Sequence, residues 1–143
     1  MTDLYNKEIL RLTLAIPKQE QRLENPTRTL HRRSRICGST LDLDVMMDDA
    51  GTITDFGWTV KACALGQASA AIIGQQMIGM TEDRLMTLKG HMDDMLRDGQ
   101  TVDWDTVMDG DFSAMKHLEA ARDHSGRFGA IYLPVDIMKQ LWW

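Results

Sequence analysis

Cysteine is scarce in this sequence, and so are proline, aromatic residues and long apolar runs. The 143 residues include 2 cysteines, 3 prolines and 6% aromatic residues. Two cysteines do not make the dense disulfide framework of a small secreted domain, so we expect free thiols in a reducing compartment. No stretch approaches the roughly 20 apolar residues of a membrane-spanning helix, and the N-terminus lacks a secretory-signal pattern. We therefore expect a cytoplasmic protein with no membrane partner.

The charge balance argues against a nucleic-acid partner. The net charge is −5, with 26% charged and 43% hydrophobic residues, as in ordinary globular proteins. The basic run at 31–35 is short and has no interleaved aromatic residues. A chain of this length buries about two-thirds of its surface on folding, so residues 1–143 are predicted to form a single domain.

Signatures of common enzymes are also missing. The sequence has no glycine-rich phosphate loop, no serine nucleophile elbow and no His-Glu-x-x-His pair. The 11 methionines fall mostly at apolar positions of expected helices, where they serve as flexible core filler. We therefore do not expect an ordinary hydrolase or kinase.

The first part of the chain is predicted to contain a helix and a short strand. Apolar spacing predicts a helix from Leu4 that ends near Ala15, because Pro17 disfavours helical geometry at the residue before it. A polar connector follows over residues 17–29. The basic segment after it is predicted to be an edge strand, whose arginines discourage aggregation through the sheet edge.

A β-hairpin is the strongest structural signal. From Ser39 to Met46 apolar and polar residues alternate, with Asp42 and Asp44 on the face opposite Ser39 and expected in solvent. Residues 48–51 supply a turn, and a second strand runs from Ile53 to Val60. We expect this hairpin at the centre of the sheet.

The remainder of the chain is predicted to be helical. One helix is expected from Ala64 to Gly79, a second begins after an N-cap at Thr81 and ends before Gly99, and residues 112–121 are weakly helical. Pro134 suits the first turn of a last helix. The predicted fold is therefore α+β, a small antiparallel sheet of about three strands covered by helices.

The two cysteines fall where the hairpin brings them together. Cys63 lies at the junction from strand to helix, where unpaired N–H groups and the helix dipole stabilise a thiolate. Cys37 directly precedes the strand that pairs with the one leading to Cys63, so both are expected at one end of the sheet. Taken alone, such a pair could be core filler, reactive thiols or metal ligands.

These residues resemble a known family. The run from Ile36 to Ser39, the alternating strand, the Gly51 turn and the small-residue segment from Val60 to Ala70 are similar to the NifU/IscU/SufU iron–sulfur cluster assembly scaffolds. The resemblance implies a SufE/NifU-like fold and an NifU N-terminal-type scaffold domain. It also implies that the protein receives sulfur from a cysteine desulfurase, holds iron or a transient iron–sulfur cluster, and passes the cluster to apo-proteins. Thiolates are the preferred ligands of such clusters.

The sequence departs from the family pattern at three positions. Ser39 replaces an aspartate, Ala62 replaces a glycine, and Gly129 stands where the family has its third cysteine. Of the family's three cysteine ligands, Cys37 and Cys63 remain as the expected ligands, with Ser39 at the aspartate position. Glycine has no side chain with which to ligate.

Two ways to complete the ligand set remain open. His124 and Asp123 lie in the expected loop before Gly129, and imidazole and carboxylate bind zinc and iron. Alternatively, Cys37 and Cys63 from each chain of a homodimer would make a four-cysteine set for a [2Fe–2S] cluster. A different hypothesis is an interaction or sulfur-acceptor module of the same fold that has lost cluster chemistry, with at most a mononuclear zinc site.

Overall fold

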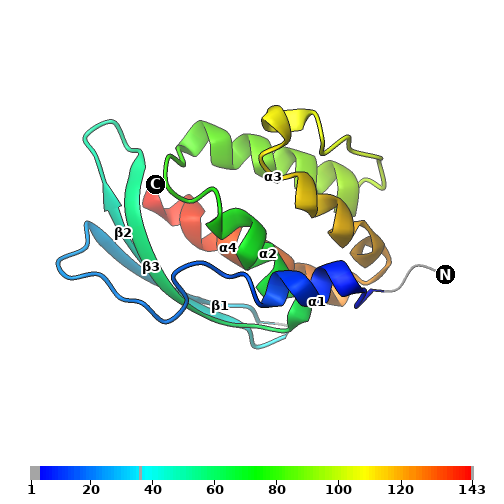
Figure 1. Cartoon of the computed structure of the whole chain (residues 1–143), viewed down its shortest axis with the longest axis horizontal. Coiled ribbons are helices and arrows are strands. Elements are labelled where there is room, and N and C mark those ends of the chain that lie inside the picture. The colour runs from blue at the N-terminus through cyan, green and yellow to red at the C-terminus, as the bar shows by residue number, and fades with distance from the viewer. Residues whose placement is uncertain (1–3, 36, 143) are drawn as a thin grey trace.

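The chain forms a three-stranded antiparallel sheet with its helices gathered on one side (Figure 1). The structure is a computed structural model that describes residues 4–35 and 37–142. The α+β class predicted from the sequence is confirmed. In chain order the elements are α1 (Lys7–Thr13), β1 (Arg28–Arg33), β2 (Thr40–Met47), β3 (Ile53–Lys61), α2 (Ala64–Gly74), α3 (Glu82–Leu96), the 3-10 helices η1 (Val107–Gly110), η2 (Ser113–Asp123) and η3 (Ser125–Arg127), α4 (Phe128–Met138) and η4 (Lys139–Leu141).

β2 and β3 form the predicted hairpin. Thr40 at the start of β2 pairs with Lys61 at the end of β3. At the turn, the Asp48 carboxylate accepts hydrogen bonds from two backbone N–H groups, and Gly51 adopts a φ of +83° that favours glycine. The register of this hairpin fixes which residues meet at each end of the sheet.

The strand order is β1-β2-β3, so β2 is the central strand. The basic segment β1 is an edge strand, as predicted, and pairs with β2 throughout its length. The prediction that the whole hairpin lies at the centre of the sheet is wrong for β3, which forms the other edge. There the polar connector runs alongside: the Gln19 side chain hydrogen-bonds the backbone of Val60 in both directions, and Gln19 bridges to Trp58.

The two faces of the sheet are covered differently. On the inner face Leu41, Leu43 and Val45 are fully buried against the helices. On the outer face Asp44 is 1% exposed, so its predicted place in solvent is wrong. The reason is the connector: Arg22 forms an ion pair with Asp44 at 2.6 Å and covers it.

The Asp44 carboxylate is fully engaged under the connector. It accepts hydrogen bonds from the Arg22 guanidinium, the Thr29 hydroxyl and the backbone N–H of Leu23. The bonds from Arg22 lower the pKa of Asp44 to about 2, against the opposing effect of burial. This contact fastens the connector to the outer face of β2.

Two of the predicted helices have different bounds. α2 ends at Gly74 and not at Gly79, because the backbone of Gly79 and Met80 hydrogen-bonds Ile53 at the start of β3. α4 begins at Phe128, so Pro134 lies inside it and not in its first turn. Nearly all of α4 is buried, and this packing outweighs the hydrogen bond that proline cannot donate.

The remaining helix predictions hold more closely. α1 ends at Thr13, two residues before the expected end. Thr81 caps α3 by accepting a hydrogen bond from the backbone N–H of Arg84, and α3 ends before Gly99 as predicted. The segment at 112–121 is helical but in 3-10 geometry. Near the end of the chain, the Trp142 indole N–H donates to the Gly51 carbonyl at 2.7 Å.

Candidate functional site

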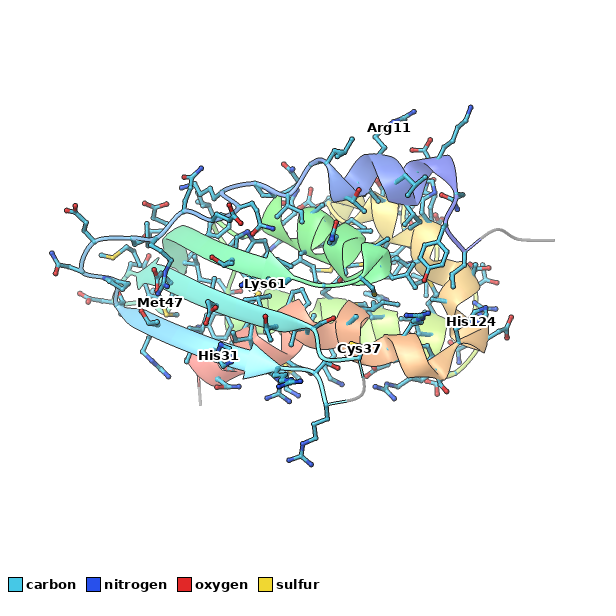
Figure 2. All side chains as sticks on the ribbon, turned by 90° about the horizontal axis from the view of Figure 1, so that it is seen from below. Arg11, His31, Cys37, Met47, Lys61 and His124 are labelled. Carbon is cyan, nitrogen blue, oxygen red and sulfur yellow. The ribbon has the colours of Figure 1, made fainter. Side chains whose placement is uncertain are left out.

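The first cysteine sits in a tight loop that joins β1 to β2. The backbone N–H of Ser34 donates to the Ser39 carbonyl at 2.8 Å, and the N–H of Gly38 donates to the Ser34 carbonyl at 3.0 Å. Gly38 has a φ of +72°, which a side chain would strain. The loop therefore holds Cys37 at the end of the sheet opposite Met47 (Figure 2).

Two serine hydroxyls contact the Cys37 thiol. The sulfur lies 3.3 Å from Ser34 Oγ and 3.2 Å from Ser39 Oγ. Burial of this partly exposed thiol favours its neutral form, whose S–H can donate to a serine oxygen. In the ionised form the two hydroxyls and backbone N–H groups can donate to the sulfur, and these bonds outweigh the effect of burial. The pKa of Cys37 is therefore lowered. Ser39, at the family's aspartate position, thus supports the thiolate as a hydrogen-bond donor.

The second cysteine is the N-cap residue of α2. Cys63 has the extended geometry typical of that position (φ −66°, ψ 171°), and its side chain makes no capping hydrogen bond. The Gln67 side chain fixes the junction by donating to the Ala62 carbonyl at 2.8 Å. Cys63 is a free, partly buried thiol, as is Cys37.

The hairpin register brings both cysteines to the same end of the sheet. Thr40 pairs with Lys61, so the residues just before β2 and just after β3 are neighbours across the hairpin. Cys37 precedes Thr40 by three positions, and Cys63 follows Lys61 by two. The sequence-based expectation of a common end agrees with this register.

Gly129, at the position expected for the third cysteine, faces the Cys37 loop. A Cβ atom added at Gly129 would overlap Ser34 Oγ. Ser34 is 8% exposed, so its hydroxyl fills this space within the protein. The place of a third thiolate is thus taken by the same hydroxyl that hydrogen-bonds Cys37. Sequence reasoning missed Ser34, because no spacing signal links it to Gly129.

His124 and Asp123 lie on a different part of the surface. Both are exposed and line a cleft of about 760 Å³ together with Lys116 and His117. In the described part of the chain, no three residues among histidine, cysteine, aspartate and glutamate form a group that could hold a metal ion. The structure therefore does not group His124 or Asp123 with the two cysteines, and their ligand role stays a prediction.

A smaller cleft lies beside the cysteine loop. It measures about 230 Å³ and separates the end of β1 from α4. Gly129 and Ser34 lie at this cleft, and Asp136 of α4 faces it. Burial raises the pKa of Asp136, against the opposing effects of Arg32 and other cations. The lining residues are Arg32, Arg33, Ser34, Arg35, Gly129, Leu133 and Asp136.

Comparison with solved structures gives a TM-score of 0.84 to a nitrogen-fixing NifU-like protein (N-terminal) from Brucella abortus, at 33% identity over 96% of this chain and 91% of that one. A putative iron–sulfur cluster assembly scaffold protein for the SUF system from Fervidobacterium islandicum AW-1 matches in fold, with a TM-score of 0.78 and 18% identity over 95% of this chain and 94% of that one.

The chain belongs to the NifU/IscU/SufU family. No protein-family model matches the sequence. No curated protein matches it either. None of the helices in the described ranges is long and apolar enough to cross a membrane.

Proposed function

We propose that this protein acts in iron–sulfur cluster assembly as a scaffold-like carrier, with Cys37 and Cys63 as thiolate ligands for iron or a transient [2Fe–2S] cluster. The observation that carries the proposal is the register of β2 and β3, which supports a common site for the two thiols. Membership of the family adds support. The cargo would be passed to apo-proteins and not chemically turned over, so the role is that of a carrier and not an enzyme.

A site with two thiolate ligands suits an iron ion or cluster that must be released to another protein. Permanent cluster sites use four strong ligands, whereas one chain here offers two thiolates and the weaker hydroxyls of Ser34 and Ser39. The remaining coordination would come from a second copy of the chain, from the partner that delivers or receives the cargo, or from His124 and Asp123. We expect the partners to be a cysteine desulfurase and apo iron–sulfur proteins.

Anaerobic reconstitution with iron and sulfide tests this proposal. The expected result is a visible absorbance band that disappears in Cys37→Ser and in Cys63→Ser, with both variants folded by circular dichroism. A matched control is Ser125→Ala, a substitution in the exposed η3 turn. Protein that stays colourless and iron-free in the wild type would contradict the proposal.

A second candidate, a sulfur acceptor, is favoured by the contacts of Cys37. Two hydroxyls and backbone N–H groups stabilise its thiolate, as a nucleophile requires. The Cys37 thiolate would attack the terminal sulfur of a desulfurase persulfide, forming a Cys37 persulfide and releasing the desulfurase thiolate. Mass spectrometry after incubation with a cysteine desulfurase and cysteine would show one added sulfur in the wild type and none in Cys37→Ser.

The alternative to a cluster scaffold also includes a protein of the same fold that binds a single zinc ion. Zinc binds thiolates and imidazole in four-coordinate sites, and two thiolates alone leave half of such a site open. Stoichiometric zinc in the protein as purified, lost in Cys37→Ser or His124→Ala, would favour a mononuclear site that uses those residues. Zinc that survives both substitutions would argue against one.

A further inference from the structure

Arginines in most of this protein are paired with carboxylates. Five arginines outside β1 and its loop each form an ion pair with an aspartate or glutamate. The paired residues are Arg11, Arg22, Arg84, Arg97 and Arg122. A group of arginines and lysines without carboxylate partners therefore departs from this pattern.

Three unpaired arginines lie beside the Cys37 loop. The side chains of Arg32, Arg33 and Arg35 are exposed, and none of them makes an ion pair or a side-chain hydrogen bond in the ranges 4–35 and 37–142. Arg32 has only a longer-range attraction to Asp136. Arg33 Nη2 lies 3.7 Å from the position of a Cβ at Gly38, so this guanidinium folds back over the cysteine loop. Three positive charges therefore lie in or next to the loop that carries Cys37.

Two further cations lie close in sequence to Cys63 and to Gly129. Lys61 is two residues before Cys63, and Arg127 is two residues before Gly129. Both side chains are exposed, and neither has an ion pair within the described part of the chain. Together, Arg32, Arg33, Arg35, Lys61 and Arg127 form what we call the cationic rim.

Two carboxylates of the adjacent strand β2 have partners other than the rim. Asp42 is bound to His31 at 2.6 Å, and Asp44 is held by Arg22. In the small cleft one carboxylate, Asp136, stands against three arginines, Arg32, Arg33 and Arg35. A chain of net charge −5 thus keeps a local excess of positive charge at its thiol end.

The edge of the sheet at this end is also open. β1 pairs only with β2, and no other segment in the described ranges hydrogen-bonds its outer side. A free strand edge is a docking site for an extended peptide, which gains main-chain hydrogen bonds there. Arginine guanidinium groups bind carboxylates through paired hydrogen bonds.

We propose that the cationic rim docks an acidic, extended segment of the protein that exchanges cargo with Cys37 and Cys63. The inference rests on the proposed function, because it names the kind of partner that the thiol site receives. An acidic segment lying along β1 would place its partner's reactive group next to the cysteine loop. Charge attraction would speed the encounter and would weaken as salt increases.

The test uses two short synthetic peptides that carry one cysteine activated as a neutral thiopyridyl disulfide. The peptides are identical except that glutamates flank the cysteine in one and glutamines in the other. Protein with Cys63→Ser leaves Cys37 as the single thiol, which displaces thiopyridine to form a mixed disulfide. The released chromophore gives the rate for each peptide.

We expect the glutamate peptide to react about tenfold faster at low salt. The preference should shrink toward unity as ionic strength rises from about 0.05 M to about 0.5 M. Arg33→Gln/Arg35→Gln should remove most of it, while the glutamine peptide keeps its rate. The matched control, Lys7→Gln/Arg11→Gln, removes the same charge from α1, on the far side of the molecule from Cys37, and should keep the preference (Figure 2).

Equal rates for the two peptides at low salt would overturn the proposal. So would a preference that survives Arg33→Gln/Arg35→Gln. If the dianionic Ellman reagent outpaces neutral dithiodipyridine but the peptides react equally, the rim attracts small anions and not a protein segment, which also overturns it. None of these rates needs iron, so a failure of cluster binding is distinguishable from a failure of docking.

Discussion

The Ser34 hydroxyl fills the space next to Gly129 at the end of the sheet that carries Cys37 and Cys63. The Ser34 hydroxyl lies where a side chain at position 129 would begin, and it contacts Cys37 Sγ at 3.3 Å. At the position where the resemblance predicts a third cysteine, a glycine and the hydroxyl of a serine from a distant part of the chain stand instead. The site therefore has two thiols, and one of them, Cys37, is contacted by serine hydroxyls.

Restoring the third cysteine should require a second substitution. Gly129→Cys alone is expected to lower the free energy of unfolding by about 1–3 kcal/mol, because its Cβ overlaps the Ser34 hydroxyl. In Ser34→Ala/Gly129→Cys the nearest atom would be the Cβ at position 34, at an ordinary 3.6 Å. Urea denaturation should show the relief, with Ser34→Ala as control.

Cobalt(II) binding tests whether the cysteine introduced at position 129 can act as a third ligand. Thiolate-to-cobalt absorbance per bound ion should be greater in Ser34→Ala/Gly129→Cys than in the wild type, because a third thiolate can join the first two. If Gly129→Cys is as stable as the wild type without the serine substitution, the two residues do not compete for one space.

Removing the second hydroxyl should weaken the Cys37 thiolate. Ser39→Ala deletes a hydrogen bond of 3.2 Å that favours the charged sulfur, so the pKa of Cys37 should rise. In a Cys63→Ser background, the pH midpoint of iodoacetamide alkylation should move to higher pH. Ser113→Ala, in η2, is the matched control. A midpoint that does not move would show that Ser39 has no influence on the thiol.

The Asp44 ion pair predicts a loss of stability in acid. Its folded pKa of about 2 lies below the ordinary 3.8, so its contribution is complete above about pH 5 and is lost as the pH falls through 3.8 toward 2. The shift corresponds to about 2 kcal/mol at neutral pH. Asp44→Asn should be destabilised by about that amount at pH 7, and the difference should vanish only below about pH 2.

A nearby aspartate provides the comparison for Asp44. Asp42 contacts the ring Nδ1 of His31 at 2.6 Å on the exposed side of the sheet, so Asp42→Asn should change the free energy of unfolding by less than about 1 kcal/mol. Urea unfolding at several pH values measures both variants. Equal, pH-independent effects of the two substitutions would contradict the assigned role of Asp44.

The alternating hairpin and the position of both cysteines could be predicted from sequence because they depend on local patterns. Residue alternation with a period of two fixes the faces of β2, and a turn with Gly51 fixes the hairpin. The burial of Asp44 could not be predicted, since it depends on a connector that crosses the outer face. The Ser34 contact was missed for the same reason, because it joins distant segments.

Pro134 shows that tertiary packing can override a local sequence preference. Proline favours the first turn of a helix, yet α4 begins six residues earlier. Residues on both sides of Pro134 are buried against the sheet and α2, and that tertiary packing sets where the helix begins. Local propensity gives a preference that a buried apolar segment can override.

The connector that covers Asp44 also makes Gly57 sensitive to substitution. A Cβ at Gly57 would overlap the carbonyl oxygen of Gln21, which is backbone and cannot rotate away. Gly57→Ala should therefore cost about 1–3 kcal/mol or more, measured by thermal or urea unfolding. Gly90→Ala is the matched control: it has open space inside α3 and should stabilise by about 0.5–1 kcal/mol.

Native mass spectrometry of anaerobically reconstituted protein identifies the bound cluster and its ligands, because it weighs the iron and sulfide and counts the chains that hold them. We predict a species carrying two irons and two sulfides of a [2Fe–2S] cluster, and its loss in Cys37→Ser and in Cys63→Ser. A cluster that persists when both cysteines are replaced, or a wild-type protein that binds no iron, would contradict the assignment of these two thiols as the ligands.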